Sequence, residues 1–422
     1  MNRTLLKNNL RLFAAASALA VFFSLLATSE STASVRIGSP CAKERQSAKI
    51  GSVKLLCIKV DKSLQWWQAS APLTYAFGPA GRLQYRYVDG KQERLNSNKQ
   101  FVGTDKRGAA NFHPIRVAAY KSLRSLESDK SLKNIRFDYV IQPNFPSEIA
   151  EVIKAQSMSA ASYLSPILEK PLEVKLVLVT EKDKQFIDNK LDSIIPSQFW
   201  LGALQVMDFY GSLETFYSRS GTGGGTASYL PEKGYAYYIG HTSSFATMKT
   251  YWPEVAPHEM GHVFQGVLSN GVDNIGQEYG EGHPKGKLTG HLIEGSANTL
   301  GMAFGFENLG WYNDEMDLLL QRDIAYFTGD VRMKTNGDAI KLIKLIESRN
   351  SELSSQLSYS AGQFLWEYFV GKYGAEKLME LYRNVGTSEN FSTNIKETIG
   401  ISKEKFYKDA APYLLANWQR LS

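Results

Sequence analysis

The feature that most constrains this chain is a five-residue stretch at 258–262, which reads His-Glu-Met-Gly-His. Positions i and i+4 of a helix project from one face, so His258 and His262 would present two imidazole nitrogens to one metal ion. Glu259 is then placed to act as a general base on a water molecule at that metal. The stretch therefore predicts a metal-binding helix with a base beside the metal.

Two prolines indicate where this helix begins. Proline is best tolerated in a first helical turn, where a missing N–H costs little. Pro253 and Pro257 therefore predict a helix that starts near Glu254 and runs toward Leu268.

A catalytic zinc site needs a third protein ligand and one open position. No third histidine follows at short spacing, because residues 268 and 272 are Leu and Val. A second helical segment, 291–304, carries Glu294 between apolar and small neighbours, which favours a half-buried carboxylate over a surface glutamate. Glu294 is the predicted third ligand. Asn298, one turn further on, is predicted to accept a hydrogen bond from a ligand imidazole.

Residues 1–33 are predicted to be a secretory signal peptide. Arg3, Lys7 and Arg11 make its amino end basic, and residues 12–27 form an apolar run that small residues follow. An uncleaved anchor is the alternative, but the run is short for a span of about 20 residues. The mature chain is expected to be secreted or at the cell surface, with no membrane span.

Charge and cysteine content narrow the function and the organisation further. The formal charge is +6, of which Arg3, Lys7 and Arg11 supply +3 within the first 29 residues, so a nucleic-acid partner is excluded. In an oxidising compartment Cys41 and Cys57 are expected to form a disulfide that staples a small module, residues 34–70. A two-cysteine metal site is the poorer alternative. This stretch resembles a cysteine-paired module of exported actinobacterial proteins. The resemblance implies a possible contact of the module with the cell envelope.

The rest of the chain is predicted to have an α+β fold. A hairpin around Asp89-Gly90 and a polar linker occupy 71–112, before a domain at 113–422. A strand, helix, strand pattern predicts a twisted mixed sheet with helices in its first part, 113–250. The second part, 251–422, is expected to be mainly α-helical.

A glycine-rich stretch, 220–225, precedes the metal-binding motif. No apolar strand comes before it, so we expect a flexible turn rather than a phosphate-binding loop. The tyrosine-rich stretch that follows it, 229–239, is typical of a strand.

The motif at 258–262 together with Glu294-Gly-Ser-Ala resembles the gluzincin metallopeptidases. A third segment, Ser-Tyr-Ser-Ala-Gly at 358–362, resembles the Ser-Tyr-Ser-Lys-Gly segment of aminopeptidase-N-type enzymes. The resemblance covers residues 135–422 and is specific at the metal motif. It implies a zincin-like fold, with an active-site helix after the sheet, and a Tyr359 hydroxyl that stabilises a tetrahedral oxyanion.

Two departures from this family refine the expected activity. The interval of 31 residues between His262 and Glu294 is longer than usual, and 270–290 is interpreted as an inserted loop. No Gly-X-Met-Glu-Asn segment precedes the motif, so the carboxylate that holds a substrate's amino terminus is missing. An endopeptidase or a peptidase of narrow specificity is therefore expected rather than an aminopeptidase.

The expected reaction is hydrolysis of a peptide or protein substrate at Zn²⁺ held by His258, His262 and Glu294. Glu259 takes the proton of the zinc-activated water, and Tyr359 donates to the oxyanion. The alternative is a catalytically silent, zinc-braced binding protein of the cell envelope, although such a protein would need neither Glu259 nor Tyr359.

The substrate backbone is expected to pair with an edge strand at 235–239, where Tyr235, Tyr237 and Tyr238 would contact it. His241 is a further candidate for substrate contact. His283 and His291 could also touch the substrate, but a solvent-exposed or structural role is favoured for each of these three histidines, and His113 is expected to be structural.

Overall fold

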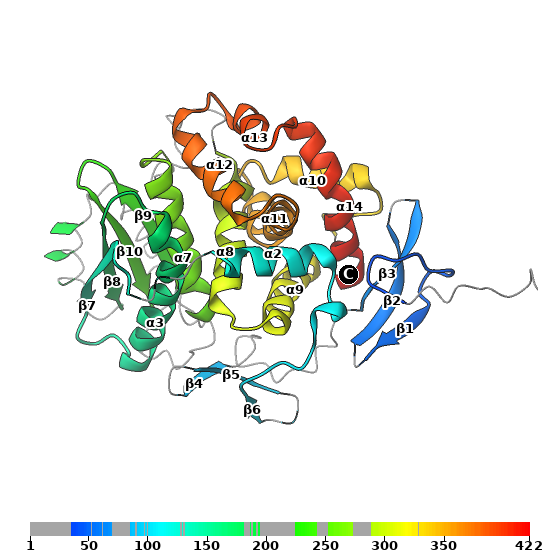
Figure 1. Ribbon diagram of the computed structural model, residues 1–422, viewed down its shortest axis with the longest axis horizontal. Coiled ribbons are helices and arrows are strands. Elements are labelled where there is room, and N and C mark those ends of the chain that lie inside the picture. The colour runs from blue at the N-terminus through cyan, green and yellow to red at the C-terminus, as the bar shows by residue number, and fades with distance from the viewer. Residues whose placement is uncertain are drawn as a thin grey trace, which may run out of the picture.

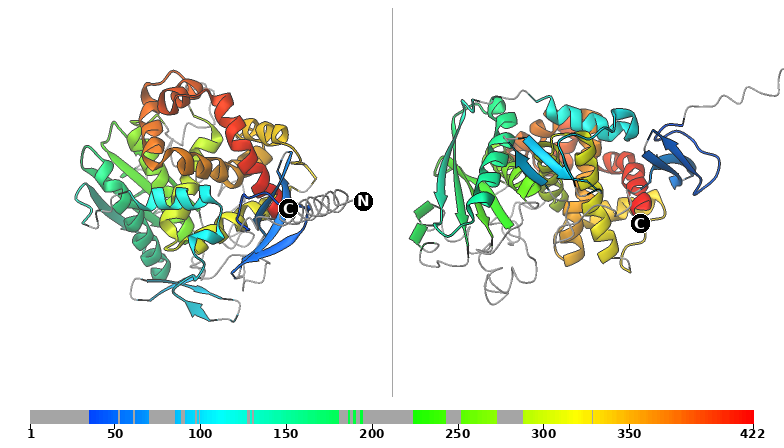
Figure 2. Two further views of the ribbon diagram at one scale, coloured as in Figure 1. Left: turned by 45° about the vertical axis from the view of Figure 1, so that its right-hand side comes forward. Right: turned by 90° about the horizontal axis from the view of Figure 1, so that it is seen from below.

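The computed structural model describes residues 35–422, except for 70–84, most of 181–223, 243–251, 273–287 and gaps of one or two residues. The predicted signal peptide and His283 lie outside the described residues. The chain is mixed α and β, as predicted. A four-stranded sheet and a small amino-terminal sheet lie at opposite ends of the molecule, with helices between them (Figures 1 and 2).

The four-stranded sheet has the order β7-β8-β10-β9. The strands β7 (Ile135–Ile141), β8 (Leu172–Val179) and β10 (Tyr235–His241) are parallel, and β9 (Gly224–Leu230) is antiparallel to β10. The helix α3 (Ser147–Leu164) connects β7 to β8, so the predicted strand, helix, strand order is confirmed.

Both faces of this sheet are covered by apolar side chains. Along β8, Val174, Leu176 and Leu178 face the large core that the sheet shares with the helices, while Val177 and Val179 face a second cluster on the far side. Successive side chains of β8 thus point to opposite faces of the sheet, and each set packs in a different hydrophobic core.

The strand β10 lies inside the sheet, so the prediction of an edge strand at 235–239 is wrong. The tyrosine-rich stretch folds back on itself as a hairpin, and this places β9 outside β10, at the edge of the described strands. Tyr237 and Tyr238 are fully buried on opposite faces and cannot contact a substrate. The Tyr235 hydroxyl donates to the backbone carbonyl of Ile194.

From α7 onward the described part of the chain is mainly helical, as predicted. The helix α7 (Trp252–Leu268) packs on α3, β9, β10 and α8 (Figure 1). The helices that follow a π-helical turn at His291–Gly295 are α8 (Ser296–Gly305), α9 (Leu309–Tyr326), α10 (Asn336–Leu345), α11 (Glu352–Tyr373), α12 (Ala375–Thr387), α13 (Phe391–Ile399) and α14 (Lys403–Leu421).

The start of α7 differs from the prediction, because Pro257 lies in its second turn. A proline there cannot donate to the carbonyl of Pro253. The end of α8 lies against that carbonyl, and the contact is possible because residue 305 is glycine. If Gly305 carried a Cβ atom, that atom would be 1.9 Å from the Pro253 oxygen. Packing between the two helices therefore outweighs the local cost of the proline.

A buried charge cluster joins four helices at the centre of the helical part. The fully buried carboxylate of Glu367 on α11 accepts hydrogen bonds from Arg116 (2.8 Å), Tyr312 (3.0 Å) and Tyr413 (2.6 Å). These partners come from α2 (Pro114–Arg124), α9 and α14. A buried carboxylate with this many donors is a strong directional contact between helices.

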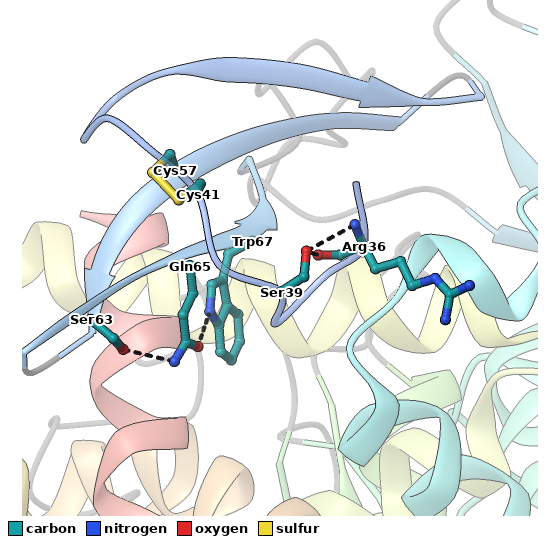
Figure 3. The surroundings of a disulfide bond; sticks show 7 residues. All are labelled: Arg36, Ser39, Cys41, Cys57, Ser63, Gln65 and Trp67. Carbon is teal, nitrogen blue, oxygen red and sulfur yellow. Dashed lines mark hydrogen bonds between the residues drawn. A yellow bond between two sulfur atoms is a disulfide. The ribbon is translucent and has the colours of Figure 1, made fainter. Parts of the chain in front are cut away.

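The amino-terminal module contains the predicted Cys41–Cys57 disulfide (Figure 3). Three antiparallel strands, β1 (Ser47–Ile50), β2 (Val53–Val60) and β3 (Ser63–Gln68), enclose a small core. That core comprises Ile37, Val53, Leu55, Cys57 and Trp66, whereas Ile58, Val60 and Trp67 join the large core. The module is thus docked onto the helices.

The described residues from 85 to 112 contain more regular structure than a hairpin and a linker. The predicted hairpin is present as β4 (Tyr85–Val88) and β5 (Lys91–Leu95), and β6 (Phe101–Val102) adds a third strand within the stretch interpreted as a linker. Arg94 and Arg107 both pair with the buried Asp314 of α9, at 2.6 and 2.8 Å. These ion pairs hold the small sheet on the helical part.

We expect reduction of the Cys41–Cys57 disulfide to destabilise the β1–β3 sheet by about 3 kcal/mol, because a closed loop of about 15 residues restricts the unfolded chain by that amount. Hydrogen exchange measured by mass spectrometry should become faster at 46–68 and stay unchanged in α7 and α8. A Cys41→Ala/Cys57→Ala variant should behave in the same way. Uniform protection in both states would contradict the prediction.

His113 joins the module to the helices, and we expect it to make folding sensitive to acid. It caps α2, its ring stacks on Trp67 at 4.4 Å, and burial lowers its pKa to about 3. Below pH 6.5 the unfolded chain therefore takes up a proton at this residue that the folded chain does not, and stability falls as the pH drops from 6.5 toward 3.

His113→Asn keeps a helix-capping side chain and removes the titration. Urea unfolding at several pH values should give a slope of stability against pH that is smaller by up to about 1.4 kcal/mol per pH unit than in the wild type. Parallel slopes would show that His113 does not contribute.

Candidate metal centre

Three buried side chains that the sequence predicted as ligands meet at one point. The ligand atoms of His258, His262 and Glu294 all lie within 4.8 Å of one another. The two Nε2 atoms are 3.0 Å apart, and Oε2 of Glu294 lies 3.4 Å from His258 and 3.3 Å from His262. This group could hold a metal ion.

The helices approach closely because small residues lie between them. A Cβ atom built at Gly301 of α8 would be 3.0 Å from the Cβ and the backbone nitrogen of His258. A Cβ atom built at Gly261 of α7 would be 3.2 Å from the Cα atom of Ala297 on α8. With no side chains between the backbones, the amino end of α8 is brought beside both imidazoles.

Glu294 lies in the π-helical turn rather than in the regular helix predicted for it. Such turns are rare and occur frequently at functional sites. The next residue, Gly295, packs on Gly362 of α11, where a Cβ atom would be 2.5 Å from the Gly362 carbonyl carbon. The turn is therefore held between α7 and α11, with its carboxylate directed toward the histidines.

The electrostatic environment of this group favours a cation. Burial lowers the pKa of His262, but the hydrogen bond and charge of Glu294 outweigh this effect and raise the pKa to about 9. Burial acts to raise the pKa of Glu294, yet Arg349 and the two histidines hold it well below its usual value. Oε2 of Glu294 is buried and faces only the two imidazole nitrogens, at 3.3 and 3.4 Å, so a metal ion held between these three atoms would be bound by all of them.

Glu259 is buried under the edge strand β9. A Cβ atom built at Gly225 would lie 2.6 Å from Cγ of Glu259 and 2.7 Å from Oε1, so a larger residue there would displace the Glu259 side chain. Burial raises the pKa of Glu259, while the histidines act in the opposite direction. A raised pKa brings a carboxylate closer to the range in which a general base works at neutral pH.

The glycine-rich stretch at 220–225 is therefore only in part what was predicted. Gly224 and Gly225 are the first residues of β9, paired with His241 and Gly240, and are not a turn. Residues 220–223 lie outside the described part of the chain. The lack of a side chain at Gly225 leaves the space that the Glu259 carboxylate occupies.

Tyr359 reaches the same site from α11. Its ring stacks on the His258 ring with centroids 5.8 Å apart, and its hydroxyl oxygen lies 3.3 Å from Nη2 of Arg349. Gly362, which contacts the π-helical turn, is three residues further along α11. The contact that positions Glu294 therefore also brings Tyr359 close.

Gln265 and Arg349 are partners of the site that the sequence analysis missed. Oε1 of Gln265 lies 2.8 Å from Nδ1 of His262, and its Nε2 donates to the carbonyl of Ile293 at 2.8 Å and to Ser296 at 3.0 Å. Its place three residues after His262, on the same helical face, was a usable signal. Arg349 donates to Oε1 of Glu294 from 55 residues away, and no local pattern predicts that contact.

Asn298 does not make the predicted hydrogen bond with a ligand imidazole in the structure. Asn298 is buried on α8, but its amide nitrogen has no partner and no hydrogen bond joins it to either imidazole. Nδ1 of His258 likewise has no partner, and Gln265 occupies Nδ1 of His262. A polar side chain on α7 itself reaches the imidazole more directly than one on α8.

The other described histidines lie outside the ligand group. His241 ends β10 beside Gly224, and burial lowers its pKa to about 4. His291 is fully buried and lies 2.9 Å from the Tyr407 hydroxyl, so it is structural, as is His113. His241 adjoins the edge strand and stays a candidate for substrate contact.

No family model, curated protein or solved structure matches this chain. None of the helices in the described part of the chain has both the length and the apolar character that a membrane span requires.

We expect Gln265→Leu to weaken metal binding by about 10- to 100-fold, as loss of a partner of a metal-bound imidazole does elsewhere. The variant removes the acceptor for Nδ1 of His262 and the donor that reaches the Glu294 turn. Zinc titration against a competing chelator gives the dissociation constant. Gln92→Leu, at a buried glutamine that donates to the Gly305 carbonyl, is the matched control and should bind like the wild type. Equal affinities for both variants would contradict the assignment.

Proposed function

We propose that this chain is an exported zinc peptidase of the gluzincin type that hydrolyses internal bonds of a peptide or protein substrate. The observation that carries the proposal is the buried group of His258, His262 and Glu294, with the carboxylate of Glu259 next to it. A metal brace for structure alone would need no buried base beside it.

Two imidazoles and one carboxylate form the donor set of many catalytic zinc sites and leave a coordination position open. Zinc bound there supplies Lewis-acid polarisation of a carbonyl and lowers the pKa of water. His258, His262 and Glu294 hold the ion, and Gln265 fixes the orientation of the His262 ring.

Glu259 moves the protons in the proposed reaction. Its carboxylate accepts a proton from the attacking water and then delivers it to the leaving amine. The raised pKa that burial gives this residue suits both steps, because the group must be deprotonated at first and protonated later. The Tyr359 hydroxyl donates to the oxyanion that develops on the substrate carbonyl.

The edge strand β9 is the surface on which we place the substrate. It is one of the two outer strands of the described sheet, with β7 at the other edge, and Gly225 brings its backbone directly over Glu259. An extended peptide that pairs with the edge of β9 opposite β10, where no described strand pairs, would run past the base. This replaces the original expectation that β10 would receive the substrate.

Export is consistent with the disulfide of the amino-terminal module, since such bonds persist in oxidising compartments. The module lies at the opposite end of the molecule from the four-stranded sheet (Figure 1). Contact with the cell envelope through the module would therefore leave the edge strand free.

We expect Glu259→Gln to lower the hydrolysis rate by about 10²- to 10⁴-fold and to leave metal binding intact, because it removes proton transfer and no ligand. Digestion of a broad peptide library by the mature protein, followed by mass spectrometry, gives the activity. Metal analysis gives the stoichiometry.

Glu307→Gln makes the same change beyond the far end of α8 and should match the wild type. Hydrolysis by Glu259→Gln at the wild-type rate, or absence of stoichiometric zinc, would refute the proposal. Stoichiometric zinc without any hydrolysis would instead favour the zinc-braced binding protein.

A further inference from the structure

Arg349 connects the two halves of the candidate site. One of its terminal nitrogens, Nη1, donates to Oε1 of Glu294, and the other lies 3.3 Å from the Tyr359 oxygen and 3.4 Å from the Ser355 hydroxyl. The guanidinium lies over the Tyr359 ring at 5.3 Å from its centroid, and the side chain is only 13% exposed. The same cation thus contacts the predicted ligand and the predicted oxyanion donor.

Backbone contacts fix the position of this arginine. It lies in the segment between α10 and α11, where the carbonyls of Ile346 and Glu347 accept hydrogen bonds from the backbone nitrogens of His291 (3.0 Å) and Gly290 (2.7 Å). A Cβ atom built at Gly290 would be 2.6 Å from Cγ of Arg349. The arginine is therefore attached to the same turn that carries Glu294.

The two oxygens of Glu294 have different partners. Oε1 pairs with Arg349, whereas Oε2 is directed at the Nε2 atoms of His258 and His262. A carboxylate with one oxygen held by a guanidinium has one oxygen left for a metal. We propose that Arg349 is a positioning residue that restricts Glu294 to single-oxygen coordination and orients Tyr359 toward the metal.

The direction of the contact with Tyr359 follows from the chemistry of the two groups. A guanidinium only donates hydrogen bonds, so the tyrosine oxygen is the acceptor in its contact with Arg349. Single-oxygen coordination leaves a metal position open for water and substrate. The orientation of Tyr359 rests on the proposed function, but the coordination of Glu294 rests on the metal site alone.

For the test, the mature protein is freed of metal and then loaded with Co²⁺. The visible absorption of protein-bound Co²⁺ weakens as its coordination number rises above four. Arg349→Gln frees Oε1 of Glu294, so the absorption should become weaker and shift, and Zn²⁺ affinity should fall by about 10- to 100-fold. Arg349→Lys keeps the charge without the fork of donors and should recover the affinity only in part. Arg383→Gln, at an exposed arginine of α12, is the control and should match the wild type.

An unchanged Co²⁺ spectrum and Zn²⁺ affinity in folded Arg349→Gln would overturn the proposal. Thermal melting of the metal-free proteins identifies variants that fail to fold, and Arg349→Lys then provides the same comparison. If the wild type hydrolyses peptides, both variants should lower kcat more than they raise KM. If it does not, the proposed function fails, while the Co²⁺ spectrum still decides how Glu294 is coordinated.

Discussion

The whole site depends on backbones that touch where side chains would normally separate them. Imidazoles on one helix and a carboxylate on another can share a metal only if the two axes come unusually close. Gly301 permits this between α7 and α8, and the contact of Gly295 with Gly362 repeats it between the π-helical turn and α11. Three separate stretches of chain are thereby held around one point. Steric fit, more than any single polar contact, sets the geometry of the ligands.

Charge is compensated differently in the two buried clusters of this molecule. Around Glu367, arginine and tyrosine donors surround a carboxylate, so the cluster serves to hold helices together. Around Glu294, one oxygen is held by the fixed charge of Arg349, and the other faces only the two imidazoles. The first arrangement is complete without a ligand, whereas the second is left with an acceptor that a cation would satisfy.

Short sequence patterns predicted the ligands that lie within one helix, and the ligand at the start of the next described helix. His258 and His262 obey helical periodicity, and the apolar neighbours of Glu294 indicated its burial. Contacts that need the tertiary fold were missed: Arg349 is distant in sequence, and the edge position of β9 follows from strand order. The second-turn proline of α7 shows packing outweighing propensity. In the described part of the chain, the disulfide, the βαβ order and the helical second half were all predictable.

The backbone bonds of Gly290 and His291 to the segment before α11 have a consequence for how the chain tolerates changes in length. They anchor the chain immediately before Glu294, just as α7 anchors it after His262. Extra residues between two fixed ends add only a slowly growing entropic cost. A change in chain length between Val272 and Leu288 therefore leaves both anchors and both ligands in place, and this is the stretch in which variation in length would be tolerated.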